Sequence, residues 1–180
     1  MQGLPLLPPA HAQHVRFVEL QPGAEQLSQV PRPAAVVAER FGQGAVCLAV
    51  YMKDRYVGYA WFAFDRYEED EVRCSYVLQR PAQTAFDFDV YVFPAYRLGR
   101  AFAAVWHASN QYLAGRGVTR TCSRIAASNL ASRRSHAQLG AREVGWALFL
   151  CLGSWQLTWS TALAFPGLHF GNRTRPRLTL

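Results

Sequence analysis

The pattern of apolar and polar residues along the chain predicts an α/β protein. Apolar runs of strand length, bounded by Pro or Gly, alternate with segments whose apolar residues recur at helical spacing. The expected strands are 14–20, 45–51, 56–64, 73–78 (its own strand or a continuation), 86–93 and 118–126, with two more inside 144–165. The expected helices are 24–30, 34–41, 100–114 and a last one from 128 or 129 to 139. The element order is therefore β-α-α-β-β-β-α-β-α-β-β, a mixed central sheet flanked by helices.

The strand, helix and strand within 86–126 predict a right-handed parallel crossover. In such sheets ligands bind beyond the carboxyl ends of the strands, next to the N-terminus of the following helix. The loop 95–100 is therefore the expected ligand site.

An uncharged stretch runs from Val144 to Phe165 and is long enough to span a bilayer, which takes about 20 residues. Gly153-Ser154 divides it into two halves rich in aromatic and β-branched residues, which favours two buried strands joined by a turn. Shallow contact of this stretch with a membrane is the alternative that stays open.

Charge is distributed unevenly in this chain of net charge +7. Residues 90–142 contain no acid but carry Arg97, Arg100, Arg116, Arg120, Arg124, Arg133, Arg134 and Arg142. An acidic run at 65–71 precedes them. This arrangement predicts an anionic ligand beside an amine-bearing one, although two unrelated solvated faces would give the same pattern.

The four cysteines are widely spaced and have no metal-ligand spacing, which favours a reducing cytoplasm over a zinc site or a disulfide scaffold. Cys47 and Cys151 lie in apolar runs and are expected to be buried. We expect one domain at 14–168, preceded by a loose arm at 1–13 and followed by a basic tail at 169–180.

Two segments carry the chemistry. Residues 92–102, VFPAYRLGRAF, form a strand end, a glycine-bearing turn and a helix start, where free N–H groups and the helix dipole bind anions. Taken alone, one Gly and two Arg at a helix start are equally typical of a capped surface turn. Residues 129–140, NLASRRSHAQLG, follow a strand with their own cap and helix.

Together these segments resemble the GNAT superfamily of acyl-CoA-dependent N-acyltransferases, over about residues 15–163. The first is similar to its cofactor loop, Arg/Gln-x-x-Gly-x-Gly/Ala after a V-x-P-x-Y-R strand end, and the second to its N-x-x-S-x-x-x-H/Y-x-x-L-G-F helix. Two departures stand out. Either Tyr96 replaces the usual Arg or Gln, or Arg100 and Phe102 replace small residues, and Ala141 replaces the aromatic after the closing Gly.

The resemblance implies direct transfer of an acyl group from acetyl-CoA or a longer acyl-CoA to an amine. It places cofactor contacts at Tyr91, Val92, Phe93, Arg97, Leu98, Gly99, Arg100, Ala101, Asn129 and Ser132. Backbone N–H groups at 91–93 would stabilise the thioester oxyanion. His136 would donate a proton to the departing sulfur, unless it is a packing histidine. Asn129 would also serve as a helix cap.

The reaction also needs a base that deprotonates the amine. The candidates are Glu68, Glu69 and Glu71 in the acidic run, then Asp89 and Asp87, which strict alternation of 86–93 puts on one face with Tyr91. Tyr67, Tyr76 and Tyr91 are candidates for lining the acceptor pocket. Solvation or packing is the competing explanation for each of these side chains.

The expected acceptor is a small-molecule amine or an amino-acid-like compound, and the expected protein is a monomer or homodimer without a metal. A long acyl chain is a variant motivated by the apolar stretch 144–165 and by Ala141. A non-catalytic acyl-CoA sensor of the same fold is the alternative function. A nucleic-acid-binding module is not expected, because basic charge occurs here without a recognisable reading helix or stacking motif.

Overall fold

The computed structural model describes residues 6–69, 71–171 and 174–180. The chain divides into two compact units. Unit 1 comprises the residues up to Phe64 together with Ala82–Ala126, and unit 2 comprises Asp65–Pro81 together with Ala127–Leu180. Each unit is described by itself.

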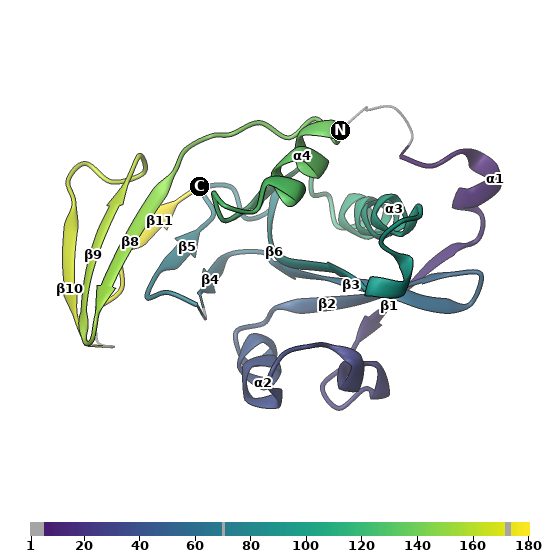
Figure 1. The fold of residues 1–180 in the computed structure, drawn as a ribbon, viewed down its shortest axis with the longest axis horizontal. Coiled ribbons are helices and arrows are strands. Elements are labelled where there is room, and N and C mark those ends of the chain that lie inside the picture. The colour runs from purple at the N-terminus through teal and green to yellow at the C-terminus, as the bar shows by residue number, and fades with distance from the viewer. Residues whose placement is uncertain (1–5, 70, 172–173) are drawn as a thin grey trace. The chain divides into compact units, whose positions relative to one another are not determined.

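Unit 1 is built on a five-stranded sheet of order β1-β2-β3-β6-β7 (Figure 1). Its strands are β1 (Val15–Leu20), β2 (Val46–Met52), β3 (Arg55–Ala63), β6 (Thr84–Val92) and β7 (Arg120–Ser123). All neighbours are antiparallel except β6 and β7, which are parallel and connected by helix α3 (Ala101–Gly115). The expected parallel crossover is therefore confirmed.

Helices cover both faces of this sheet (Figure 1). Helix α3 packs on one face over Val50 and Phe62, through residues that include Val105. The other face, with Tyr59 and Trp61, is covered by the 3-10 helix η1 (Glu25–Gln29) and by α2 (Ala34–Gly42). The apolar side chains of the two layers leave the sheet buried on both sides, which explains why β2 and β3 are continuous apolar runs.

A β-bulge in β6 overturns the expectation that Asp87, Asp89 and Tyr91 share one face. Opposite β6, Trp61 pairs with Asp89 while the next residue, Phe62, pairs with Asp87, so Phe88 is an extra residue in the ladder. The extra residue reverses the direction of the side chains that precede it. Asp87 therefore lies on the α3 face with Phe62, and Asp89 lies on the α2 face with Trp61.

The parallel strands β6 and β7 pair over a short stretch and then separate. Their pairing runs from Thr84 opposite Arg120 to Asp87 opposite Ser123, while β6 continues to Val92. Within the described part of unit 1, the edge of β6 beyond Asp87 therefore has no partner strand. This open edge leads directly into the 3-10 helix η2 (Pro94–Tyr96) and the start of α3.

Unit 2 contains two small sheets and helix α4 (Leu130–Gln138). One sheet has the order β11-β5-β4, and the other has the order β10-β9-β8. Their strands are β4 (Arg66–Glu68), β5 (Ser75–Val77), β11 (Arg177–Thr179), β8 (Ala147–Leu152), β9 (Trp155–Ser160) and β10 (Gly167–Phe170).

The ends of the chain differ from the expected arm and tail. The expected arm contains the short helix α1 (Pro9–Ala12) and a buried Leu7. The expected basic tail contains β10 in part and β11, which pairs in parallel with β5. Residues 1–5 of the arm, 172–173 of the tail and Asp70 of the acidic run lie outside the described residues.

The uncharged stretch 144–165 forms the expected pair of strands. β8 and β9 are antiparallel and joined at Gly153, whose φ of 54° suits a tight turn. The expected burial is wrong, since five of the six residues of β8 are exposed, Cys151 among them. Across the described ranges, no helix combines the length and apolarity needed to cross a bilayer.

Candidate anion site at the start of helix α3

Helix α3 begins without a capping side chain. Arg100 occupies the N-cap position, and its side chain makes no hydrogen bond to the first turn. The first N–H groups of a helix have no partner within it, and over 15 residues the dipole concentrates partial positive charge at this end. The start of α3 is therefore open to an anion.

A cavity of about 600 Å³ lies beside this helix start. Its walls come from the β2–β3 turn and from the loop that precedes α3: Met52, Lys53, Arg55, Val57, Ala95, Tyr96, Leu98, Gly99, Arg100 and Ala101. Lys53, Arg55 and Arg100 are cationic, and none of the lining residues is an acid. The cavity is thus a positively charged site formed within unit 1.

The β2–β3 turn brings Lys53 to this cavity. Lys53 and Asp54 both have left-handed backbones, with φ of 46° and 61°, as a two-residue type I′ hairpin requires. Such residues are usually Asn or Gly, and a left-handed Lys costs on the order of 1 kcal/mol. Arg16 forms an exposed ion pair with Asp54 at 3.3 Å. The sequence predicts the turn, but only the tertiary structure shows that it faces the loop 95–100.

Arg97 does not line this cavity. Its Nε donates a 3.0 Å hydrogen bond to the carbonyl oxygen of Val92, and its guanidinium lies 5.1 Å from the centroid of the Tyr91 ring. Gly99 has an ordinary backbone, and an added Cβ would lie 3.6 Å from the Tyr96 oxygen. Of the two arginines predicted to bind a phosphate, Arg100 lines the cavity, whereas Arg97 contacts the end of β6.

The backbone N–H groups of residues 91–93 point alternately to the two edges of β6. Phe93 N–H donates to the carbonyl oxygen of Val57 at 3.0 Å, which occupies it in the sheet. Successive N–H groups of a strand point to opposite edges, so Val92 N–H points to the open edge. Gly58 lets the two strands approach here, because a Cβ on it would lie 2.3 Å from the Tyr91 carbonyl oxygen.

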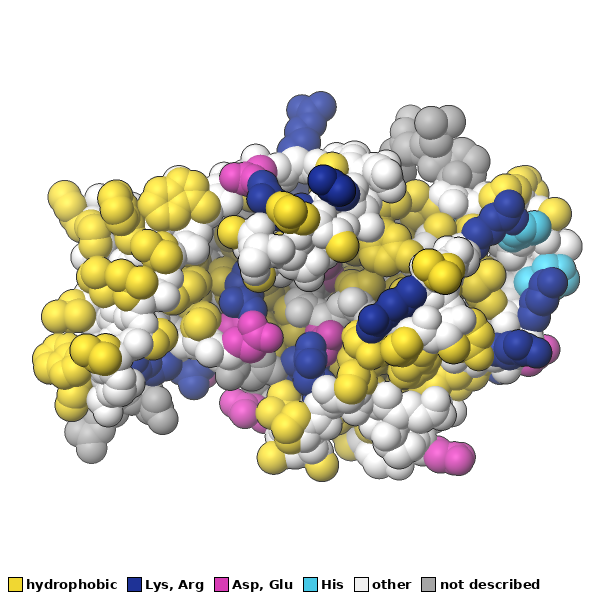
Figure 2. All heavy atoms as spheres, viewed as in Figure 1, with side chains coloured by type: hydrophobic (Ala, Val, Ile, Leu, Met, Phe, Trp, Pro, Cys, Tyr) yellow, Lys and Arg dark blue, Asp and Glu magenta, His cyan; other side chains and the backbone are white. Residues whose placement is uncertain are grey.

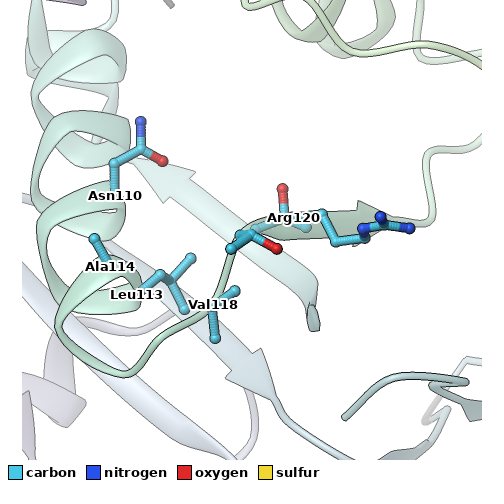
Figure 3. Close-up of a pocket in the computed structure, with 7 residues that line it drawn as sticks. Asn110, Leu113, Ala114, Val118 and Arg120 are labelled. Carbon is cyan, nitrogen blue, oxygen red and sulfur yellow. The ribbon is translucent and has the colours of Figure 1, made fainter. Parts of the chain in front are cut away.

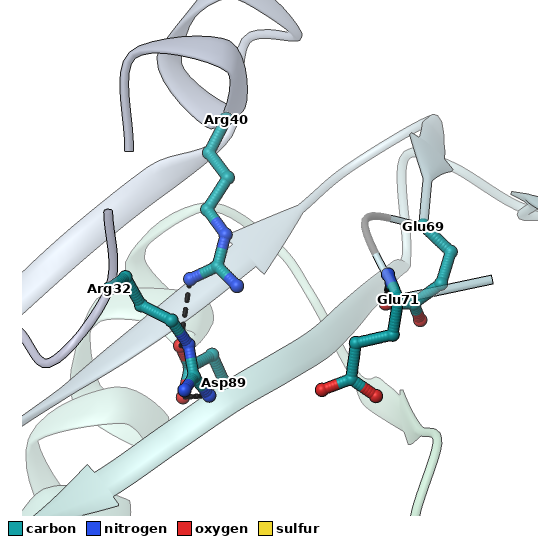
Figure 4. Close-up of polar contacts among 5 residues, drawn as sticks. All are labelled: Arg32, Arg40, Glu69, Glu71 and Asp89. Carbon is teal, nitrogen blue, oxygen red and sulfur yellow. Dashed lines mark hydrogen bonds and ion pairs between the residues drawn. The ribbon is translucent and has the colours of Figure 1, made fainter. Parts of the chain in front are cut away.

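Asp89 is held by two arginines on the α2 face (Figure 4). Arg40 Nη1 donates to Asp89 Oδ2 at 2.7 Å, while Arg32 donates to both carboxylate oxygens at 3.0 and 3.3 Å. Asp89 and Arg40 are almost completely buried. A carboxylate engaged on both oxygens in this way anchors α2 and the preceding loop to the sheet, which is a structural role.

Asp87 is placed differently. It is buried at the last rung shared by β6 and β7, and its Oδ1 accepts a 2.6 Å hydrogen bond from Ser123 Oγ. Its Oδ2 is buried and has no hydrogen-bond partner among the described residues. Burial raises the pKa of Asp87 to about 7, although the Ser123 hydrogen bond opposes this rise.

The three glutamates predicted as bases belong to unit 2, where they make local contacts. Glu68 lies 3.7 Å from the Arg175 guanidinium. Glu69 is buried, and its Oε1 accepts a 3.4 Å hydrogen bond from Glu71 N–H (Figure 4). Tyr67 and Tyr76 are buried and face each other across the β4–β5 ladder.

Three further predicted residues are linked along α4. Asn129 is its N-cap, because Asn129 Oδ1 accepts a 3.1 Å hydrogen bond from Ser132 N–H. His136 is buried, and its Nδ1 lies 2.8 Å from the Ser132 carbonyl oxygen. The Ser132 hydroxyl oxygen lies 3.3 Å from the same nitrogen, so both groups of Ser132 hold the imidazole in place. The capping role foreseen for Asn129 is confirmed.

The predicted site residues therefore fall into two groups. Asp89 and the predicted cofactor contacts from Tyr91 to Ala101 belong to unit 1, where the helix start gathers Leu98, Gly99, Arg100 and Ala101 around the cavity. Asn129, Ser132, His136 and the three glutamates belong to unit 2. Lys53 and Arg55 are cavity residues that the sequence did not identify, because no local pattern links a hairpin turn to a loop about 40 residues later.

A second, smaller cavity of about 100 Å³ lies between the C-terminal half of α3 and the start of β7 (Figure 3). Its lining includes Asn110, Leu113, Val118 and Arg120. Its volume corresponds to a few water molecules at about 30 Å³ each. This space is too small for a nucleotide-sized ligand.

Comparisons with known proteins identify the fold. No family model matches the chain, and no curated protein matches its sequence. The structure is similar to AAC(6')-Iy in complex with the bisubstrate analogue CoA-S-monomethyl-acetylneamine, with a TM-score of 0.54 and 14% identity over 77% of this chain and 98% of that one. It is also similar to an aminoglycoside acetyltransferase from an uncultured soil metagenomic sample in complex with sisomicin, with a TM-score of 0.52 and 10% identity over 78% and 97% of the two chains.

A transcriptional regulator from Bacillus halodurans C-125 is similar to the same degree, with a TM-score of 0.54 and 15% identity over 77% of this chain and all of that one. At these identities the likeness concerns the fold. The chain has the mixed α/β fold of GNAT acetyltransferases, as the two sequence segments predicted.

Proposed function

We propose that this protein is an N-acyltransferase that binds acyl-CoA at the start of α3 and transfers the acyl group to a small amine. The cationic cavity beside the uncapped helix start carries this proposal. The GNAT-type fold supports it at the level of architecture.

The phosphates of acyl-CoA are the groups that fit the cavity. N–H groups in the first turn of α3 would hold one phosphate, and Arg100 would neutralise it from the same loop. Lys53 and Arg55 reach the cavity from the β2–β3 turn and would hold a second phosphate. Arg97 supports this site indirectly, because it ties the loop to Val92 and Tyr91.

Acyl-CoA supplies an acyl group activated as a thioester. An amine nitrogen that attacks it forms the new amide bond, the carbon–sulfur bond breaks, and the free thiol leaves. The open edge of β6 offers Val92 N–H as a hydrogen-bond donor for the acyl or pantetheine portion of this ligand.

For the base we propose Asp87 ahead of the other acids. Its pKa of about 7 suits proton transfer near neutral pH, and its Oδ2 retains an unused acceptor. It lies at the fork between β6 and β7, on the strand that leads to the helix start. Asp89 fits this role less well, because both of its oxygens already accept from arginines.

The remaining roles that we propose are those that the resemblance implies. His136, held by its Nδ1 to the Ser132 carbonyl, is our candidate for proton donation to the departing sulfur. The acidic segment with Glu68, Glu69 and Glu71 is our candidate for attracting a cationic amine. The acceptor is a small amine or amino-acid-like molecule by analogy with the neighbours, one of which was solved with sisomicin.

Titration calorimetry with CoA, acetyl-CoA and palmitoyl-CoA, followed by an assay of thiol release with a panel of amines, tests the proposal. Binding together with amine-dependent thiol release is the expected result. Tight binding without turnover for any amine would favour the acyl-CoA sensor instead. No binding of any of the three would refute the assignment of the cavity. Comparison of the acetyl and palmitoyl thioesters also selects the acyl length.

A further inference from the structure

One face of the sheet β10-β9-β8 in unit 2 is apolar throughout. Residues that pair directly across neighbouring strands lie on the same face. Leu148 pairs with Trp159, Leu150 with Leu157, and Leu152 with Trp155, while β10 adds Leu168 and Phe170 opposite Leu157 and Trp155. We call these eight side chains the apolar face: Leu148, Leu150, Leu152, Trp155, Leu157, Trp159, Leu168 and Phe170.

The burial of this sheet is the reverse of what its chemistry favours. Every residue of the apolar face is exposed, from 39% for Leu157 to 80% for Leu152. On the opposite face of β9, the polar residues Gln156, Thr158 and Ser160 are buried. Gln156 fixes this orientation by exchanging hydrogen bonds of 3.0 and 2.7 Å with the backbone of Arg73.

Figure 2 shows apolar side chains gathered over β8–β10. Isolated exposed apolar residues are ordinary on protein surfaces, but a contiguous patch of this size marks an interaction site. With about 150–250 Å² for a whole aromatic side chain, eight large residues near half exposure offer roughly 700 Å². A standard protein interface buries about 800 Å² per partner, so the apolar face has nearly the area that a stable dimer needs.

We propose that the apolar face is the contact between two copies of this chain, packed sheet against sheet about a twofold axis. Such a contact presents the same patch from both subunits and therefore must be self-complementary. Residues 144–170 contain no Lys, Arg, Asp or Glu. Two copies that each carry a net charge of +7 repel one another elsewhere, and they can approach closely on an uncharged surface.

The composition also favours a copy of the chain over a lipid surface. Trp155, Trp159 and Phe170 suit the core of a homodimer interface, where aromatic residues are enriched and charged ones are depleted. Peripheral membrane surfaces usually combine an apolar face with flanking Lys or Arg that attract anionic lipids. The strands β8, β9 and β10 contain no Lys or Arg, and the guanidinium of Arg73 beside them already donates to the carbonyl oxygens of Ser154 and Gly171.

Sedimentation velocity of the full chain at micromolar concentration tests this proposal with a matched pair of variants. Leu150 and Leu130 are 55% and 56% exposed, but Leu130 begins α4 and lies outside the apolar face. Wild type and Leu130→Glu are expected to sediment as dimers. Because of the twofold axis, Leu150→Glu places one charge from each subunit in the contact. The substitution is expected to raise the dimer dissociation constant by at least about 100-fold.

Leu168→Glu in β10 gives an independent variant of the same face, and circular dichroism confirms that each variant retains its strands. Dilution of wild type is expected to shift tryptophan emission to the red as Trp155 and Trp159 become hydrated. Weak but specific dimers have dissociation constants on the order of 100 µM, so a wild-type protein that is monomeric at about this concentration would overturn the proposal. Dimers that persist in both Leu150→Glu and Leu168→Glu would overturn it as well. A monomer that co-sediments with phosphatidylcholine vesicles would also overturn it, in favour of a membrane contact.

Discussion

Ser123 Oγ donates a 2.6 Å hydrogen bond to Asp87 Oδ1 on the last rung that β6 and β7 share. Beyond this rung the two strands separate, and the open edge of β6 leads to the start of α3. The hydrogen bond orients a buried carboxylic acid whose other oxygen has no partner among the described residues. The relationship makes Asp87 the residue whose replacement is most informative about the reaction.

Asp87→Asn is expected to reduce turnover by about 100-fold or more, because Asn cannot accept the proton, and to leave CoA affinity unchanged. Turnover of the wild type is expected to rise with pH around an apparent pKa of about 7. Steady-state rates from pH 5.5 to 9 and calorimetry with CoA check both parts. Full activity of the variant with the same pH profile would remove Asp87 from the reaction.

The same pKa has a consequence for stability. Burial raises the pKa of Asp87 from 3.8 in its ordinary environment to about 7, so the folded state binds this proton more tightly than the unfolded state. The contribution of Asp87 to stability therefore falls as pH rises from about 4 to about 7 and is constant above that. Urea unfolding at pH 8 is expected to show Asp87→Asn more stable than wild type, by on the order of a few kcal/mol.

The proposed phosphate site predicts that neighbouring arginines contribute differently to CoA binding. Arg100→Ala and Lys53→Ala each remove a cation that lines the cavity and are expected to weaken CoA binding by about 3- to 30-fold, more at low salt than at high salt. Arg97→Ala is expected to weaken it less, since Arg97 points to Val92 and Tyr91. Calorimetry at two salt concentrations measures this, with Arg80→Ala, an exposed arginine of unit 2, as the control. A larger loss for Arg97→Ala than for Arg100→Ala would place the phosphates elsewhere.

His136→Ala is expected to slow turnover more than it weakens CoA binding, because a donor to the leaving sulfur acts during bond breakage. His136 is also buried, so the variant's thermal midpoint must be measured alongside its rates. Ser132→Ala keeps the Ser132 carbonyl, which lies 2.8 Å from His136 Nδ1, and removes the hydroxyl, which lies 3.3 Å from the same nitrogen, so it tests the hydroxyl separately. Wild-type rates in His136→Ala would assign this histidine to packing alone.

Removal of the Asp89 carboxylate is expected to destabilise unit 1 severely. Asp89→Asn removes the buried carboxylate charge that Arg32 and Arg40 contact, and removing one partner of a buried ion pair costs about 3–5 kcal/mol. The free energy of unfolding in urea measures this cost. Asp54→Asn, which breaks only the exposed pair with Arg16, is the matched control and is expected to change it by less than about 1 kcal/mol. Equal effects of the two substitutions would contradict a structural role for Asp89.

The periodicity of the sequence determined most of the regular structure and the fold. The continuous apolar runs of β2 and β3, the spacing of α3 and the Gly153-Ser154 turn are local signals, so strands, helix and hairpin form where they were expected. The loop 95–100 could be selected as a candidate anion site because a strand followed by a glycine-bearing helix start has the same geometry in any such crossover.

Tertiary structure decided three features of the protein that local sequence patterns cannot encode. The extra residue at Phe88 places Asp87 and Asp89 on opposite faces of the sheet. This β-bulge could not be predicted, because the alternation of apolar and polar residues continues through it. Lys53 joins the cavity because the β2–β3 turn meets a loop that is remote along the chain. The direction in which the sheet faces is decided by the contacts of Gln156 with Arg73, which bury the polar side of β9 and leave the apolar face exposed. Periodicity fixes which residues share a face, whereas burial depends on what packs against that face.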